Sequence, residues 1–214
     1  MERWSFWFLN RMRKKYPPEV VWEQRKNEIK SFGIEPGQRI LDVGCGVGDW
    51  AILFKKMAGK NGYVAGIAPT AYFIEASKKN AQAAGVEVDF RLGNMETLQF
   101  DDNSFDIVTC FAVMMNVQDP DKMAGLKDMF RVLKPGRKMI VYDLAKPPKS
   151  LMLPVNFWFY RMIYGVFGKI FWQGKFQQMM EKAGFTSLEQ TTPQRMDPMW
   201  LCYYMGVKPI DKGS

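Results

Sequence analysis

The stretch LDVGCGVGDW, residues 41–50, decides the fold of this chain. An apolar run at 39–43 predicts a buried strand, a glycine loop follows it, and the pattern then predicts a helix over 48–58. The loop glycines permit positive φ angles and close approach of a ligand, and the start of the helix offers free backbone N–H groups. The loop therefore predicts a ligand site, with a tight turn that binds nothing as the alternative. Because Asp49 stands where dinucleotide folds have their third glycine, the spacing argues against NAD and FAD.

The sequence on either side of this loop alternates between strand and helix patterns. Further strands are predicted at 63–67, 87–92, 105–110, 138–143, 185–192 and 200–207, and further helices at 18–31, 70–84, 120–132 and 174–183. The segment LKPG, before the strand at 138, is typical of a turn. Repeated strand–helix units with apolar strands predict a parallel sheet that is covered by helices on both faces.

Composition excludes several kinds of chemistry. The chain has 214 residues, a formal net charge of +8 and no histidine, so a histidine base, a Ser-His-Asp triad and a histidine-bound metal are excluded. Its three cysteines lack the spacing of a zinc site, and we expect no metal. The positive charge favours an anionic partner such as a membrane surface, a nucleic acid or an acidic substrate. A basic protein without such a partner is the alternative.

Two segments, 4–12 and 151–172, are rich in aromatic residues and methionine, with basic residues between them. Such segments form adaptable apolar walls and amphipathic membrane contacts. We expect a lid over a lipophilic substrate and a peripheral membrane contact, with plain cover helices as the alternative; nucleic acid is the weaker prediction, because no RNA-binding motif occurs. No signal peptide and no uninterrupted apolar run of about 20 residues is found. A cytoplasmic location, at the membrane surface, is therefore expected.

Three motifs together resemble class I S-adenosylmethionine-dependent methyltransferases: LDVGCGVG, GNMETLQFDDNSFDIVTC and FRVLKPGRKMIVYD. Within that superfamily, NSFDIVTCFAVMMNVQDPDKMAGLKDMFRVLKPG and the later KPP and NFWFYRMIYGVFGK are most similar to the C-methyltransferases of ubiquinone and menaquinone synthesis. Thiol methyltransferases and phospholipid N-methyltransferases have similar cores. The resemblance implies a Rossmann-like α/β fold with a seven-stranded, mostly parallel sheet and an antiparallel last strand. It also implies a single domain over residues 1–214, with an N-terminal helical lid at 1–31 and an aromatic insert at 146–173 over the substrate site.

The same resemblance implies which positions hold S-adenosylmethionine and the methyl acceptor. The glycine loop and the acid before it would surround the methionine part of the cofactor, and the segment after the third strand would lie beside its adenine. The candidate cofactor-binding residues are Tyr16, Asp42, Gly44, Cys45, Gly46, Gly48, Ala68, Pro69, Thr70, Asn94, Met95 and Phe111. The candidate substrate-binding residues are Met115, Asn116 and Trp158, and the candidate catalytic residues are Asp143 and Tyr160.

Asp143 is the best-placed carboxylate for orienting or deprotonating a substrate, because ligands of α/β sheets lie at the carboxyl ends of the strands. A helix cap or a surface acid is the alternative interpretation of this residue. For Met115 the alternative is simple packing. Tyr16 and Tyr160 have structural alternatives as well.

Three positions depart from the family pattern. Ala68 stands where an acid usually holds the ribose, Asn94 stands where an acid lies beside the adenine, and Met115 stands where an arginine or a histidine occurs. The amide of Asn94 still accepts a hydrogen bond, whereas Ala68 cannot. A hydrogen bond to a charged group contributes roughly 1.5–3 kcal/mol, so the loss at this position predicts weaker binding. Thr70, backbone groups or water are left to hold a ribose.

We expect S-adenosylmethionine-dependent methyl transfer to a lipophilic or aromatic small molecule with a quinone-like, thiol or lipid acceptor. Transfer from a sulfonium needs alignment and exclusion of water above all, so an acidic acceptor makes a histidine base unnecessary. The first alternative is a protein of methyltransferase fold with altered or lost cofactor binding and a regulatory role, since three positions depart together. The second is another α/β nucleotide enzyme, such as a dehydrogenase.

Overall fold

The structure, a computed structural model, describes residues 17–146, 168–196 and 199–210. The chain divides into two units, Met1–Glu35 and Pro36–Ser214. In the first unit, α2 (Pro18–Gln24) and α3 (Lys26–Ser31) replace the single predicted helix, because the backbone leaves helical geometry at Arg25, with φ −107° and ψ 16°. Most of the predicted lid at 1–31 and most of the predicted insert at 146–173 lie outside the described residues.

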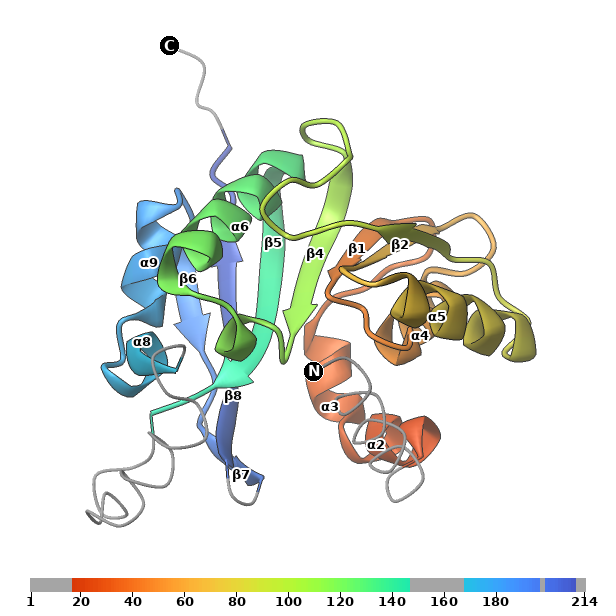
Figure 1. The fold of residues 1–214 in the computed structure, drawn as a ribbon, viewed down its shortest axis with the longest axis horizontal. Helices are drawn as coiled ribbons and strands as arrows, with labels where there is room; N and C mark the ends of the chain where they lie inside the picture. The colour runs from red at the N-terminus through yellow and green to blue at the C-terminus, as the bar shows by residue number, and fades with distance from the viewer. Residues whose placement is uncertain (1–16, 147–167, 197–198, 211–214) are drawn as a thin grey trace. The chain divides into compact units, whose positions relative to one another are not determined.

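An eight-stranded sheet forms the centre of the second unit, in the order β3-β2-β1-β4-β5-β8-β6, with β7 paired to β8 outside this path (Figure 1). Its strands are β1 (Arg39–Val43), β2 (Tyr63–Ala68), β3 (Asp89–Leu92), β4 (Phe105–Phe111), β5 (Leu133–Leu144), β6 (Thr186–Gln190), β7 (Gln194–Met196) and β8 (Met199–Val207). The first five run parallel, and β8 runs antiparallel to β5 and β6. The predicted sheet is confirmed in its parallel part and its antiparallel last strand, but its strand count is too low by the short β7.

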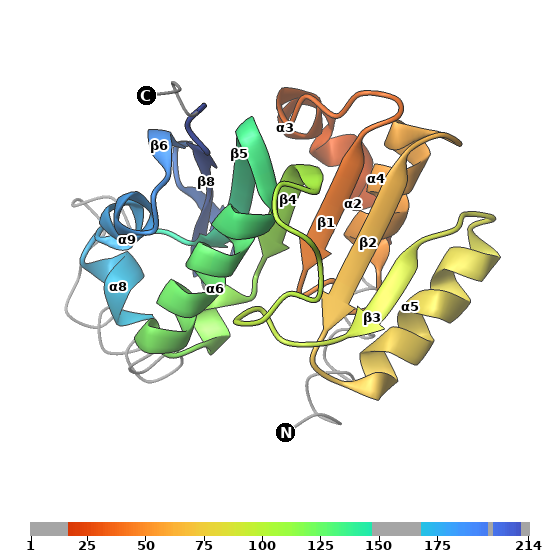
Figure 2. The same cartoon turned by 90° about the horizontal axis from the view of Figure 1, so that it is seen from above.

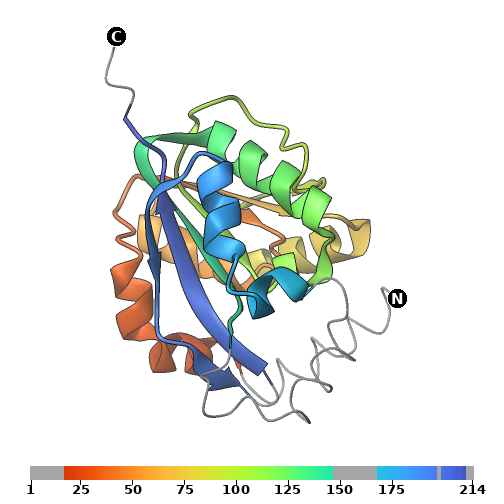
Figure 3. The ribbon, with the colours of Figure 1, turned by 90° about the vertical axis from the view of Figure 1, so that its left-hand side faces the viewer.

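Helices cover both faces of this sheet. They are α4 (Asp49–Ala58), α5 (Ala71–Ala83), α6 (Asp119–Val132), α8 (Lys169–Trp172) and α9 (Phe176–Lys182), and a 3-10 turn, η1 (Met114–Asn116), precedes α6. Figure 2 shows α6, α8 and α9 on one face and α4 on the other, and Figure 3 shows α9 lying over β8. Next to α4, the α5 residue Asn80 donates from Nδ2 to the carbonyl oxygen of Val47 at 2.8 Å. None of the helices in the described ranges combines the length and the apolar character needed to cross a membrane.

The LKPG segment is the start of β5 and not a separate turn. Leu133 already pairs with Phe105, and the register then shifts so that Lys138 pairs with Ile107. Within the shifted segment Gly136 has φ +74° and donates its N–H to the carbonyl oxygen of Lys208 at 2.7 Å. The proline and the glycine of this segment indicate an irregular backbone, and the register shift agrees with that. The prediction of a turn is wrong, because the segment lies within strand β5, which pairs with β4.

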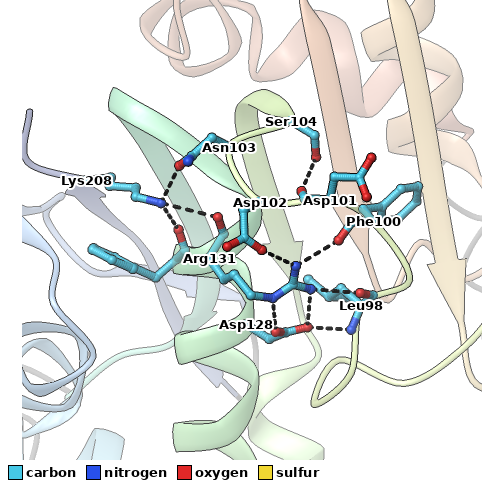
Figure 4. Close-up of polar contacts among 10 residues, drawn as sticks. Leu98, Phe100, Asp101, Asp102, Asn103, Ser104, Asp128, Arg131 and Lys208 are labelled. Atoms are coloured by element: carbon cyan, nitrogen blue, oxygen red, sulfur yellow. Dashed lines mark hydrogen bonds and ion pairs between the residues drawn. The ribbon is translucent and has the colours of Figure 1, made fainter.

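Arg131 of α6 holds the connection between β3 and β4 (Figure 4). Its guanidinium donates to the carbonyl oxygens of Leu98 and Phe100, each at 2.8 Å, and pairs with Asp102 at 2.7 Å. On its own helix it pairs with Asp128 at 2.6 Å. This planar fork of donors therefore attaches the residues that follow the predicted adenine segment to a helix on the sheet.

Candidate functional site

The glycine loop connects β1 to α4 and is hydrogen-bonded to the carboxyl end of β2. The N–H groups of Gly44 and Cys45 both donate to the carbonyl oxygen of Ile67, at 2.8 and 2.9 Å. Gly44 has φ +76°, and a Cβ atom at this position would lie 2.2 Å from Cγ2 of Val113. A side chain is therefore excluded at Gly44 by its neighbour as well as by its backbone.

Gly46 differs from Gly44 because its outer side is open. Its φ is +54°, yet a Cβ atom built there would have no heavy atom of the described residues within 4 Å. The space at this point lies before the first turn of α4, where Gly48 at the N-cap provides no side-chain hydrogen bond. None of the residues that the structure describes obstructs the approach of a ligand to the backbone here, as a cofactor-binding loop requires.

A cavity of about 120 Å³ lies at the carboxyl ends of the first four strands. It brings together segments that are far apart in the sequence, and its walls are Val43, Gly44, Ile67, Pro69, Gly93, Asn94, Met95, Glu96, Val113 and Val117. Four predicted cofactor-binding residues are among them: Gly44, Pro69, Asn94 and Met95. Sites for complete small molecules have volumes of about 300–1,000 Å³, so this cavity has room for one part of a nucleoside.

A larger cavity, about 670 Å³, lies at the opposite edge of the sheet, where β2 and β3 begin. Lys55, Lys78 and Asp89 are among its lining residues, and none of the predicted site residues is. Open α/β sheets bind their ligands beyond the carboxyl ends of the strands. The smaller cavity is therefore the candidate cofactor site, despite its size.

Asp42 lies beneath the glycine loop, with 2% of its surface exposed. Its Oδ1 accepts a hydrogen bond from the Thr109 hydroxyl at 2.9 Å. Burial raises the pKa of Asp42 to about 7, while hydrogen bonds from Thr109 and the Ala51 N–H act in the opposite direction. Next to it, burial and the charge of Asp42 raise the pKa of the Cys45 thiol well above its ordinary value. A thiol held in its protonated form is not a nucleophile.

Ala68, Thr70 and Phe111, which are also predicted cofactor residues, are not among the residues that line the cavity. Ala68 is 1% exposed, and its carbonyl oxygen accepts the N–H of Gly93 at 3.1 Å. Thr70 is the N-cap of α5, where its hydroxyl accepts the N–H of Phe73 at 3.4 Å. Phe111 belongs to an aromatic cluster in which its ring centroid lies 5.0 Å from that of Trp50. Tyr16, which carries the last cofactor prediction, lies outside the described residues.

Three of the predicted substrate and catalytic residues are described by the structure, Met115 and Asn116 after β4 and Asp143 in β5. Met115 is buried and Asn116 is exposed, both in η1, and the Asn116 amide donates to the carbonyl oxygen of Ala112 at 3.2 Å. Asp143, at the end of β5, has no exposed surface. Its Oδ1 accepts the N–H of Leu144 at 2.7 Å, and its Oδ2 accepts the N–H of Met115 at 3.3 Å. Trp158 and Tyr160 lie outside the described residues.

Several residues of this region are not predicted by the sequence. Val113 and Val117 line the cavity, and Glu96 is the only ionisable side chain among the lining residues that the structure describes. Lys122 has a fully buried side chain, and its positive charge acts to lower the pKa of Asp143. Glu96 follows β3, and Val113 and Val117 follow β4. Because ligands bind at the carboxyl ends of the strands, this position in the sequence could have indicated these three residues. Lys122 has no such signal, because a lysine in the first turns of a helix is usually exposed.

The sequence of this chain is similar to those of a known protein family. The ubiE/COQ5 methyltransferase family matches residues 19–175. The chain is 36% identical over 155 residues to the demethylmenaquinone methyltransferase of Staphylococcus aureus strain MRSA252, and the match covers 72% of this chain but 62% of that relative. The chain thus spans less than two thirds of the length of this relative.

Solved structures have the same fold. An S-adenosylmethionine-dependent methyltransferase of Methanosarcina mazei superimposes with a TM-score of 0.68 at 20% identity, over 86% of this chain and 97% of that one. An arsenic(III) S-adenosylmethionine methyltransferase of Chlamydomonas reinhardtii has a TM-score of 0.63 at 25% identity, over 85% of this chain and 66% of that one.

Proposed function

Because this chain belongs to the ubiE/COQ5 methyltransferase family, we propose that it transfers the methyl group of S-adenosylmethionine to a lipophilic, quinol-like acceptor. The observation that carries the proposal is the cavity of about 120 Å³ at the carboxyl edge of the sheet. Its walls combine the glycine loop, the segment after β2 and the segment after β3, and these are the three segments expected to hold the cofactor.

The residues of this region fit S-adenosylmethionine. The open side of Gly46 offers room for the amino-acid part of the cofactor beside the start of α4, and the apolar walls with Asn94 suit an adenine base. Bound there, the cofactor supplies an electrophilic methyl group on a positively charged sulfur. The protein would align this group with the acceptor and exclude water, which are the main requirements of an in-line transfer.

The acceptor class rests on two observations. The Staphylococcus aureus relative is named for a demethylated menaquinone, and this chain has no histidine to act as a base. A reduced quinone is acidic enough to react as its anion, so the two observations agree. The aromatic and basic composition of residues 4–12 and 151–172 supports a cytoplasmic protein that takes its acceptor from the membrane surface.

Binding and transfer test this proposal together. We expect S-adenosylhomocysteine to bind in calorimetry, and labelled methyl groups to pass from S-adenosylmethionine to a reduced naphthoquinone that carries a prenyl chain. Gly46→Asp is expected to abolish both by filling the open side of the loop. Gly37→Asp is the matched control, because Gly37 also has a positive φ of +84° with no heavy atom near its Cβ position but precedes β1.

Each outcome separates the proposal from an alternative. If S-adenosylhomocysteine binds but no quinol is methylated, the proposed acceptor class is wrong and the proposed cofactor stands. The absence of binding at millimolar ligand would favour a regulatory protein of methyltransferase fold, an alternative that the joint departure of Ala68, Asn94 and Met115 from the family pattern supports. Equal losses in the two glycine variants would indicate general backbone strain and not a site.

A further inference from the structure

The loop from Ala112 to Val117 leaves β4 in a strained conformation. Ala112 has φ +57°, a backbone conformation that is unfavourable for a residue with a Cβ atom. Its N–H donates to the carbonyl oxygen of Tyr142 at 2.7 Å, so the strain occurs where the loop is still attached to β5. Such a backbone persists only where surrounding contacts determine it.

Asp143 makes one set of those contacts from the neighbouring strand. Its Oδ2 accepts the N–H of Met115, in the middle of the loop, at 3.3 Å, and its Oδ1 accepts the N–H of Leu144 at 2.7 Å. Burial raises the pKa of Asp143 to about 7, and the backbone N–H groups of Leu144, Met115 and Met114 act in the opposite direction, as does the charge of Lys122. Both carboxylate oxygens are therefore engaged with backbone, and the side chain has no exposed surface.

Lys122 makes the second set of contacts from α6. Its ammonium donates to the carbonyl oxygen of Val117, at the end of the loop, at 2.7 Å, and to Asp119 Oδ1 at 2.8 Å. The Lys122 side chain is fully buried, whereas that of Asp119 is 43% exposed. A buried lysine is costly unless its charge is compensated, and the carbonyl oxygen of Val117 is part of that compensation. The middle of the loop is thus held by a buried carboxyl group and its end by a buried ammonium group.

The same loop forms a wall of the candidate cofactor site. Val113 and Val117 line the cavity of about 120 Å³, and Val113 lies so close to Gly44 that a Cβ atom there would overlap it. On the loop's exposed side is Asn116, which is predicted to meet the substrate. A movement of this loop would change the cofactor site and the acceptor side at once.

We propose that Asp143 and Lys122 are a pair of positioning residues that hold residues 112–117 in place between the cofactor and the methyl acceptor. The proposal rests on the proposed function for its two ligands, but the holding of the loop is independent of it. It gives Asp143 a role other than deprotonating the substrate, because a carboxylate with no exposed surface and two backbone partners does not reach an acceptor. Lys122 thereby joins the site although it touches neither ligand.

Amide hydrogen exchange without any ligand tests the holding of the loop. Asp143→Asn keeps the shape of the side chain but turns one acceptor into a donor, and Lys122→Met keeps the volume and removes the charge. In each variant we expect exchange of the Met115, Asn116 and Val117 amides to accelerate by at least about 10-fold. Because the two residues act on one loop, the double variant is expected to resemble the worse single variant. If Asp143→Asn does not fold, Lys122→Met carries the test.

Asp106→Asn is the matched control for these variants. Asp106 is also a partner of a lysine, Lys134, at 2.9 Å, but it lies at the amino end of β4. We expect it to change stability without changing exchange in the loop. Unchanged exchange of the loop amides in both Asp143→Asn and Lys122→Met would overturn the proposal.

Binding and transfer then separate a positioning role from a catalytic one. Positioning predicts that both variants weaken S-adenosylhomocysteine binding by about 3- to 10-fold and lower the rate of transfer together with it. A base at Asp143 predicts a rate loss of about 100-fold or more with unchanged affinity and exchange, and a harmless Lys122→Met; that result would refute positioning. If the wild-type protein binds no S-adenosylhomocysteine, the proposed function fails, while the exchange data still decide the holding of the loop.

Discussion

At the scale of single residues, Ala68 is the position with the clearest chemical consequence. It ends β2 directly before Pro69, which lines the candidate cofactor cavity, and its side chain offers no acceptor for ribose hydroxyls. Among the described residues of this cavity, Glu96 alone carries a carboxylate. A bound nucleoside therefore has fewer charged partners here than in a site with an acid at the end of the second strand.

We expect Ala68→Asp to tighten binding of S-adenosylhomocysteine by at least about 10-fold, the equivalent of one hydrogen bond to a charged group. Calorimetry with the wild type and the variant measures this change. Ala68→Asn has the same size without the charge, and a smaller gain is expected for it. Weaker or unchanged affinity in Ala68→Asp would mean that the cavity is shaped for another ligand.

The same scale shows which residues a sequence can reveal. Gly44 and Gly46 are predictable because their role follows from local spacing, a preceding strand and a following helix. The burial of Asp143 and Lys122 depends on η1, β5 and α6 coming together, and nothing in the local sequence distinguishes them from surface charges. Ala68 was recognisable as a departure, but which group replaces the acid depends on the fold of the segment after β3.

At the scale of elements, Arg131 connects α6 to the segment that follows β3. It pairs with two carboxylates and donates to two carbonyl oxygens, although its side chain is 34% exposed. Removal of the guanidinium leaves these partners without their donor. The segment from Leu98 to Asp102 would then lose its attachment to the helix.

Arg131→Met is expected to lower the free energy of unfolding by about 2 kcal/mol, given that hydrogen bonds to charged groups contribute about 1.5–3 kcal/mol and that partial exposure weakens them. Urea denaturation measures it. Arg137→Met is the control, because Arg137 is 48% exposed and pairs with Asp106 at 3.5 Å; a change within about 0.5 kcal/mol is expected there. Equal effects of the two substitutions would show that the connection is unimportant for stability.

Elements were predictable where periodicity and punctuation agree, as in β1, β4 and α6. The three residues of β7 are too few for an alternating pattern, and β7 forms because β8 offers it an edge. The division of the predicted helix at Arg25 has no proline or glycine to signal it. For LKPG, the proline and the glycine led to the prediction of a turn. The segment belongs to β5 because it pairs with a neighbouring strand, and the local sequence does not show that pairing.

At the scale of the whole molecule, buried carboxylates make stability depend on pH. The pKa values of Asp42 and Asp143 are both raised from 3.8 to about 7, mainly by burial. A raised pKa in the folded state means that the folded protein binds protons more tightly than the unfolded chain. This contribution to stability is complete below about pH 4 and is lost as the pH rises through about 7.

Denaturation by urea is therefore expected to require less denaturant at about pH 8 than at about pH 5.5. Asp89 and Asp106 act in the opposite sense, because their pKa values are lowered, but their contribution is lost only below about pH 4. Asp42→Asn, which cannot ionise, is expected to reduce the difference between the two pH values. A larger difference in this variant would contradict the assignment.

The antiparallel position of β8 has a consequence for the synthesis of the chain. The strand β5, which carries Asp143, has β4 on one side and β8 on the other, with Asp143 opposite Cys202. Until residues 199–207 have emerged from the ribosome, β5 is an exposed edge with unpaired backbone groups, a known route to aggregation. The edge of β5 that carries Asp143 therefore becomes paired only after β8 has been synthesised.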